Sequence, residues 1–547
     1  MAMQRRAFLK SLAGIGGISA LGSAGQLILP TQAMAAAPGF NDYKALVCVY
    51  LYGGNDVFNM LVPIGADADR GYAPYASIRG DLAVNNEDLG LDQITTNGSD
   101  LNQGVIGGAQ QNPYNQNLNQ STAYTRGVYS LSAKGIDLGV NGVMPELAQL
   151  ITDDKVSILG NIGTLVRPVT RDEIRNTHPE LPLYLFAHNH QQRILQTGQA
   201  NNLNDVGWAG KIADNWDNIN QNSPLGLNIS YAGNDRMLIG QSTSPLVLKP
   251  GSLPSINHLR EGVGNSYDDR RAFFKALSGV EGSTDRLTFD ASRTNTTADP
   301  YKTLYNQMQL KSLTTFEQLN QSWNSVQVDY TTLGPYGEAL FDIPTAQQLG
   351  FTSSIRGRLI SQLEAVAKMI HLGASGNLGA GFNRQIFFVE LGGFDTHANQ
   401  ASEHPMLLRE LSLGLWKFQK ALEELGHAEK VTSFTMSDFG RTLSQNGDGT
   451  DHAWGSHQLV MGGDGTGAAG QFDGGKLIGE LPTMQLGGID DYSDKGRMIP
   501  KLSQDQVNAA LTHWFGADNN LISNLFPNLT NFQSGGNIES AFSPLFL

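Results

Sequence analysis

Three apolar runs of strand length in this sequence are each followed by a small or polar turn that contains an aspartate. The three aspartates are Asp56, Asp395 and Asp438. Because ligands of an open parallel sheet bind beyond the carboxyl ends of its strands, these carboxylates are expected to converge on one site. Converging carboxylates repel one another unless a cation neutralises them. The pattern therefore predicts a divalent metal.

Histidines occur in short polar motifs close to the same aspartates. Mixed imidazole and carboxylate ligands suit zinc, manganese or iron better than calcium. We therefore expect one or two divalent ions, zinc or manganese before others, and we assign no residue to an organic cofactor. The candidate metal ligands are Asp56, Asp395, His397, Asp438, His452 and His457.

His188 and Arg441 are the candidate catalytic residues. His188 is separated from His190 by one residue. That spacing puts two side chains on one face of a strand but not of a helix, so only one of the two is expected to be a ligand. Arg441 lies three residues after Asp438. It could hold an anion through two parallel hydrogen bonds, or it could pair with Asp438.

Simpler structural roles stay open for these residues. An aspartate after a strand often caps the next helix, which would account for Asp395 or Asp438 taken alone. A histidine beside Trp454 could be a packed core residue. The occurrence of three such aspartates together with histidines favours a metal or catalytic site.

Strands and long helices would position these residues. Apolar residues recur at intervals of three and four between Ile355 and Ile370 and between Leu407 and Leu425, which predicts two helices with one buried face each. Gly426 is a suitable helix end. The predicted strands are Ala45–Tyr52, Val156–Gly160, Gln385–Leu391, Val431–Met436 and Gln458–Met461.

The apolar strands point to a fold class. Continuous apolar runs of this kind are typical of strands that are covered on both faces. The strand, helix and strand between residues 385 and 436 predict a βαβ unit with a right-handed crossover. We therefore predict an α/β fold with a mostly parallel central sheet, helices on both faces and long polar loop insertions.

The N-terminus carries an export address. Arg5 and Arg6 form the twin-arginine pattern in MAMQRRAFLK, which is followed by a weakly apolar stretch and by small residues that suit a signal peptidase. We predict a signal peptide over residues 1–36 and one α/β domain over residues 37–547, with insertions at about 67–140 and 255–345. The expected location is the periplasm or beyond it.

Composition narrows the class of partner. The net charge is −14, and loss of Arg5, Arg6 and Lys10 with the signal makes the mature charge −17. Such an acidic protein is a poor match for nucleic acid. No apolar run after the signal has the length of a transmembrane helix. Cys48 is the only cysteine, which excludes an intramolecular disulfide.

Several motifs resemble those of a family of twin-arginine-exported bacterial proteins known as the domain-of-unknown-function 1501 family. They occur in family order across nearly the whole mature chain. Besides the export signal, they are VYLYGGNDVFNMLVP (Val49–Pro63), LFAHNHQQ (Leu185–Gln192), GWAGKIAD (Gly207–Asp214), ELGGFDTHANQ (Glu390–Gln400) and SDFGRTLSQNGDGTDHAWG (Ser437–Gly455).

That family is similar to the alkaline-phosphatase-like superfamily, which includes sulfatases and the cofactor-independent phosphoglycerate mutases. The resemblance implies a mixed α/β sheet and usually two metals. It implies that Asp56 is the ligand after the first strand, that Asp395 and His397 bind one metal, and that Asp438 is the aspartate of an Asp-His-Gly motif. His452 or His457 would supply the last histidine.

Two positions depart from the family pattern. Phe439 follows Asp438 where the superfamily commonly has a metal-binding histidine, and Ala187 stands where many relatives have a serine before the histidine. A methyl group cannot act as a nucleophile. The resemblance therefore implies either water as the nucleophile or the loss of hydrolysis.

Two functions are expected on these grounds. The first is an exported metal-dependent hydrolase of phosphate or sulfate esters, which would act on a small anionic ester or an envelope polymer. The alternative is a catalytically inactive envelope protein that retains the fold as a binding or assembly scaffold, with no protein partner identified. An arrangement of Asp56, Asp395, Asp438 and a histidine at metal-ligand distances, with an open position for substrate, would favour the enzyme.

Overall fold

The computed structural model describes residues 39–90, 127–216, 219–220, 225–251, 315–379, 381–462 and 474–545. The predicted signal segment lies outside the described residues, as do residues 91–126 and 255–314 of the two predicted insertions. The chain divides into a small unit, residues 1–36 and 254–321, and a large unit, residues 37–253 and 322–547. The elements below belong to the large unit.

All five predicted strands are present in the central sheet. They are β1 (Lys44–Tyr52), β5 (Val156–Gly163), β8 (Arg384–Gly392), β9 (Val431–Ser437) and β12 (Ser456–Gly462). Four short strands complete a nine-stranded sheet: β6 (Asn228–Ser230), β7 (Leu246–Val247), β13 (Leu477–Gly479) and β14 (Leu502–Ser503). The strand order is β13-β5-β12-β9-β1-β8-β6-β7, with β14 paired to β5.

The sheet is mixed but mostly parallel. β1 pairs in parallel with β8 on one side and with β9 on the other, whereas β12 is antiparallel to both β9 and β5. The chain passes from β9 to β12 through the hairpin of β10 (Arg441–Gln445) and β11 (Thr450–His452). Because no crossover helix intervenes, β12 returns in the opposite direction. The predicted α/β class is confirmed.

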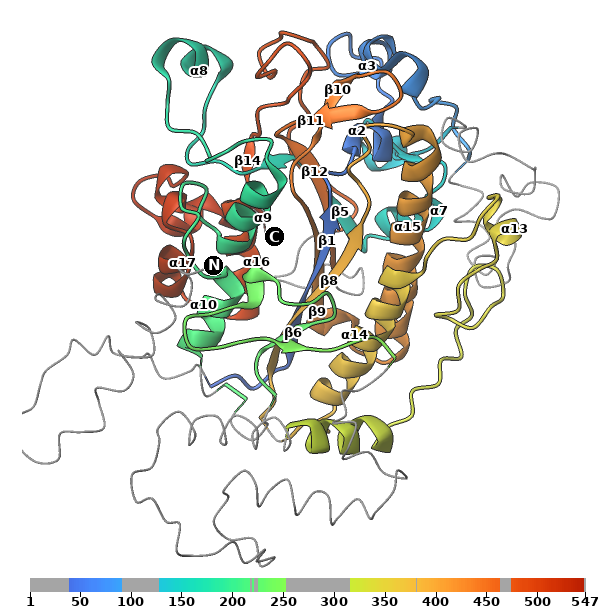
Figure 1. Cartoon of the computed structure of the whole chain (residues 1–547), viewed down its shortest axis with the longest axis vertical. Helices are drawn as coiled ribbons and strands as arrows, with labels where there is room; N and C mark the ends of the chain where they lie inside the picture. The colour runs from blue at the N-terminus through green and yellow to red at the C-terminus, as the bar shows by residue number, and fades with distance from the viewer. Residues whose placement is uncertain are drawn as a thin grey trace, which may run out of the picture. The chain divides into compact units, whose positions relative to one another are not determined.

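Helices cover both faces of the sheet. The two predicted helices are α14 (Arg358–Ala374) and α15 (Gln400–Glu424), and they lie with α7 (Pro145–Thr152) on one face (Figure 1). The other face carries α9 (His188–Thr197), α10 (Trp208–Asn215), α16 (Gln504–Phe515) and α17 (Asn519–Leu525). Alternate residues of β1, including the buried Cys48, pack in an apolar core with this second group of helices.

Smaller elements lie around this framework. They are α2 (Val57–Met60), α3 (Tyr72–Arg79), α8 (Arg171–Thr177), α13 (Ala346–Leu349) and a three-stranded sheet of β2 (Leu61–Pro63), β4 (Leu138–Asn141) and β3 (Val128–Ser130). Within the described ranges, no helix combines the length and the apolar character needed to cross a membrane.

Candidate metal centre

Turns after three adjacent strands meet at the carboxyl end of the sheet. These turns follow β1, β8 and β9, and the tight contact between the first two depends on Gly53. Its φ is +116°, and a Cβ there would lie 2.3 Å from the backbone nitrogen of Asp395. Gly54 is similarly close to the ring of Phe439. Glycine is required because the turns approach more closely than any side chain would allow.

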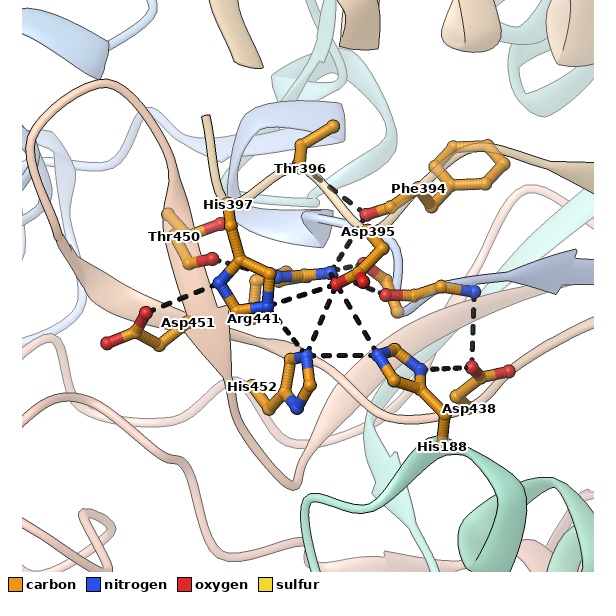
Figure 2. Close-up of polar contacts among 12 residues, drawn as sticks. His188, Phe394, Asp395, Thr396, His397, Asp438, Arg441, Thr450, Asp451 and His452 are labelled. Carbon is orange, nitrogen blue, oxygen red and sulfur yellow. Dashed lines mark hydrogen bonds and ion pairs between the residues drawn. The ribbon is translucent and has the colours of Figure 1, made fainter. Parts of the chain in front are cut away.

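Four side chains converge on one point: His188 at the start of α9, Asp395 and His397 in the turn after β8, and His452 at the end of β11 (Figure 2). The Nε2 atom of His452 lies 3.0 Å from Nε2 of His188 and 2.8 Å from Nε2 of His397. The Oδ1 atom of Asp395 lies 3.4 Å from Nε2 of His188, 3.1 Å from that of His397 and 3.2 Å from that of His452. We call these four residues the histidine cluster.

The opposite ring nitrogens of the histidine cluster face oxygen atoms. Nδ1 of His188 lies 2.6 Å from Oδ2 of Asp438, and Nδ1 of His452 lies 2.8 Å from the carbonyl oxygen of Phe186. Nδ1 of His397 faces Asp451 at 3.5 Å. A carbonyl oxygen can only accept, so His452 carries its proton on Nδ1 and, when neutral, presents a lone pair at Nε2.

Asp438 holds His188 from a buried position. Its side chain is fully buried, and Oδ2 also accepts hydrogen bonds from the backbone nitrogen of Gly53 at 3.1 Å and from Nε2 of Gln192 at 3.0 Å. The hydrogen bond to this carboxylate raises the pKa of His188. Burial instead lowers the pKa of His452.

Arg441 contacts the aspartate of the cluster from behind. Its side chain is fully buried and its NH2 nitrogen donates to Oδ1 of Asp395. Burial alone would raise the pKa of Asp395, but the hydrogen bond and the charge of Arg441 hold that pKa below its usual range. Asp395 is therefore ionised at neutral pH. The ion pair considered for Arg441 from the sequence was with Asp438, and the structure shows it with Asp395 instead.

Two of the predicted metal ligands lie apart from the histidine cluster. Both oxygens of Asp56 pair with Arg79, at 2.7 Å each, and both side chains are fully buried. Asp56 also accepts a hydrogen bond from Gln400. His457 is buried and its Nδ1 accepts a hydrogen bond from the backbone nitrogen of Asn161 at 2.9 Å.

The two histidines of the HNH motif have different surroundings. His188 is the first residue of α9, and His190 stacks on Tyr184 with ring centroids 4.2 Å apart. The helix turns their side chains in different directions, as expected for residues two apart. Ala187 is the N-cap of α9 and makes no side-chain hydrogen bond there.

Phe439 forms an aromatic wall beside the cluster. Its ring centroid lies 4.7 Å from that of His188 and 4.5 Å from that of His452. Neither Asp395 nor Asp438 caps a helix, because the N-cap of α15 is Asn399 and the element after Asp438 is strand β10. The capping explanation is therefore wrong for both aspartates.

Several residues of the site carried no signal in the sequence. Arg79 is 23 positions from Asp56, and nothing in its local sequence indicates a buried ion pair. The contact of His452 with the backbone carbonyl of Phe186 could not be predicted from a motif, because every residue has such a carbonyl. Asp451 lies beside His452 in the sequence, and this adjacency was the available clue.

Within the described residues, His188, Asp395 and His452 form a group that could hold a metal ion. Each offers one ligand atom, and the three atoms lie within 4.8 Å of one another. His397 adds a fourth nitrogen beside His452. These side chains are between 21% and 48% exposed, so the centre is accessible from solvent.

Comparison with known proteins gives one family match. A family model described as a protein of unknown function (DUF1501) matches residues 378–484. This segment contains β8, α15, β9 and the hairpin, and therefore three of the four residues of the histidine cluster. No curated protein matches the chain. Residues 378–484 are thus similar to the DUF1501 family.

Proposed function

We propose that the histidine cluster binds a divalent transition metal through His188, Asp395 and His452, with His397 as a further ligand. The supporting observation is that Nδ1 of each of the three histidines faces an oxygen atom, whereas the three Nε2 atoms face one another. With Nδ1 of each histidine turned to an oxygen atom, the three Nε2 lone pairs face one another and a carboxylate oxygen. Such a set is repulsive unless a cation lies among the four atoms.

A metal ion suits this arrangement better than a proton. One proton can bridge only two of the atoms. Asp438 raises the pKa of His188 and favours a proton there, but that proton would not lie between His397 and His452, whose Nε2 atoms are 2.8 Å apart. The lowered pKa values of Asp395 and His452 oppose protonation of either of those groups. Ligand atoms about 2.0–2.1 Å from zinc at tetrahedral angles would lie roughly 3.3–3.4 Å apart. The distances of 3.0 to 3.4 Å among His188, Asp395 and His452 are close to that spacing.

The outer contacts of the cluster also support metal binding. Metal-binding histidines commonly donate their second ring nitrogen to a carboxylate or a carbonyl oxygen, which fixes the tautomer and the ring orientation. Here Asp438 and the carbonyl of Phe186 fill that role for His188 and His452. Three imidazoles with one carboxylate and no thiolate favour zinc, manganese or iron over magnesium or calcium.

On this centre we propose a metal-dependent hydrolase of phosphate or sulfate esters, exported by the twin-arginine route to the cell envelope. A bound divalent metal would polarise an ester oxygen and lower the pKa of water. Ala187 provides no nucleophile at the start of α9. Two threonine hydroxyls could be considered as nucleophiles instead, but both are engaged elsewhere. Thr164 is buried and donates a hydrogen bond to Gln191 at 2.9 Å, and Thr170 caps α8. Water is therefore the nucleophile that this site favours.

The substrate we propose is a small anionic ester. The mature charge of −17 opposes its approach, so attraction must come from the metal itself. Arg441 does not add to it directly, because its side chain is fully buried against the protein. Its role in our proposal is to position Asp395, not to bind the ester.

Hydrolysis of chromogenic esters tests this proposal. The protein would be loaded with zinc or manganese and assayed with 4-nitrophenyl phosphate, bis(4-nitrophenyl) phosphate and 4-nitrophenyl sulfate. We expect turnover of at least one ester, and a loss on the order of 100-fold in Asp395→Ala, because the centre supplies several kcal/mol of charge stabilisation.

Asp172→Ala is the matched control, since it removes one exposed carboxylate from α8. It should leave the rate unchanged. Metal binding without turnover of any ester would contradict the hydrolase and favour the alternative of an envelope scaffold.

A further inference from the structure

The guanidinium of Arg441 joins the turns that carry the ligands of the histidine cluster. Its Nε donates to the carbonyl of Gly54 at 2.9 Å, and NH1 donates to the carbonyl of Thr450 at 2.8 Å. NH2 donates to the carbonyls of Gly53 at 2.6 Å and Phe394 at 3.1 Å, as well as to Asp395. One side chain thus bonds to the turn after β1, the turn after β8 and strand β11.

These contacts reach the cluster through the backbone as well as directly. Phe394 directly precedes Asp395, and Thr450 lies two residues before His452. The hydrogen bonds to their carbonyls therefore fix the backbone from which these two ligands project. Gly53 also donates its backbone N–H to Asp438, which orients His188. Displacement of Arg441 would therefore loosen three ligands at once.

We infer that Arg441 is a positioning residue that sets the geometry of the metal centre. This inference rests on the proposed metal centre. Arg441 does not touch the metal or the substrate; it holds Asp395 and the three segments in register. A guanidinium suits this task because its planar fork presents five donors in fixed directions, whereas a lysine ammonium is a compact charge with three donors.

Arg441→Lys separates geometry from charge. The variant keeps the positive charge beside Asp395 but cannot reach all of the carbonyl oxygens that Arg441 contacts. We expect cobalt(II) or zinc affinity to fall at least tenfold, in the range found when outer partners of metal ligands are lost. We also expect the visible absorption bands of bound cobalt(II) to change, since these bands report ligand geometry.

Arg409→Lys is the matched control. Arg409 is also fully buried and forms an ion pair with Glu146 on α7, on the helical face away from the histidine cluster. The Arg409→Lys variant should lose stability, as Arg441→Lys does, but it should keep the wild-type metal affinity and cobalt spectrum. Each protein would be titrated well below its own unfolding temperature. Arg441→Gln, which removes the buried charge, serves if the lysine variant does not fold.

The outcomes separate this inference from the proposed function. Weaker binding and an altered cobalt spectrum in the Arg441 variants, with normal binding in Arg409→Lys, would support it. Wild-type affinity and spectrum in a folded Arg441 variant would overturn it and leave the metal centre intact. If the wild type itself binds neither cobalt nor zinc, the proposed centre fails, and the role of Arg441 fails with it.

Discussion

Asp438 acts on the histidine cluster through His188. The fully buried carboxylate accepts a hydrogen bond from Nδ1 of His188 and so turns Nε2 towards the rest of the histidine cluster. Replacement by asparagine keeps the size of the side chain but removes its charge, so the imidazole becomes a weaker and less firmly oriented ligand. For Asp438→Asn we expect metal affinity to fall roughly 10- to 100-fold, measured by calorimetric titration with zinc.

Asn189→Ala serves as the control, since Asn189 follows His188 on α9 and belongs to no contact of the cluster described above. An unchanged affinity in Asp438→Asn would show that the hydrogen bond between Asp438 and His188 does not support the centre.

The sequence predicted part of the site at the residue level. Asp395, His397 and Asp438 follow strands β8 and β9 at one edge of the sheet, and the separate hairpin of β10 and β11 brings His452 to the same place. His188 was predicted as a catalytic residue, and its place among the ligands comes from α9, which no strand pattern could indicate. Asp56 follows β1 in the same way as Asp395 and Asp438 follow β8 and β9. Its charge, however, is neutralised by a buried ion pair with Arg79, so it does not join the cluster. A partner 23 residues away cannot be identified from spacing.

At the level of elements, the start of α14 depends on a side chain from α15. The carboxylate of Glu410 accepts hydrogen bonds from the backbone nitrogens of Gly357 at 3.0 Å and Leu359 at 2.8 Å. The first N–H groups of a helix have no acceptors within the helix, and here the buried carboxylate of Glu410 is their acceptor. This contact fixes α14 against α15 beneath β8.

For Glu410→Ala we expect the free energy of unfolding to fall by about 1–3 kcal/mol, because two buried N–H groups lose their acceptors. Urea denaturation followed by circular dichroism would measure this loss. Glu403→Ala, on the exposed first turn of the same helix, should change the free energy by less than about 0.5 kcal/mol. Equal effects in the two variants would contradict the capping role.

The main elements could be predicted because each follows from a local pattern. Continuous apolar runs gave β1, β5, β8, β9 and β12, and the spacing of apolar residues gave α14 and α15. The direction of β12 could not be predicted, because it depends on the short hairpin connection from β9 and not on the composition of β12 itself. The prediction of a mostly parallel sheet is confirmed, and β12 is an antiparallel strand within it.

At the scale of the whole molecule, one buried carboxyl group couples folding to pH. Burial raises the pKa of Asp505 in α16 to about 8. The folded-state pKa thus exceeds the unfolded value of about 3.9. The stability from this group is complete below pH 4 and is lost as the pH rises towards 8.

Asp505→Asn removes this dependence because its amide does not ionise. We expect the free energy of unfolding to rise by more than about 1 kcal/mol at pH 8, and by less at pH 5. Denaturation curves at both pH values would measure the difference. Asp172→Asn, an exposed substitution with the same change of charge, should show no such pH dependence. A gain of equal size at the two pH values would contradict the buried, protonated state of Asp505.

The central claim is that the histidine cluster binds a transition metal. The most direct test is to measure the metal content of the purified wild type, His188→Ala and His190→Ala by elemental mass spectrometry. The two histidines are two residues apart, but only His188 points into the cluster. The account predicts about one equivalent of transition metal in the wild type and in His190→Ala, and a large loss in His188→Ala. A wild-type protein that stays metal-free when offered zinc or manganese at neutral pH, or equal metal content in all three proteins, would contradict it.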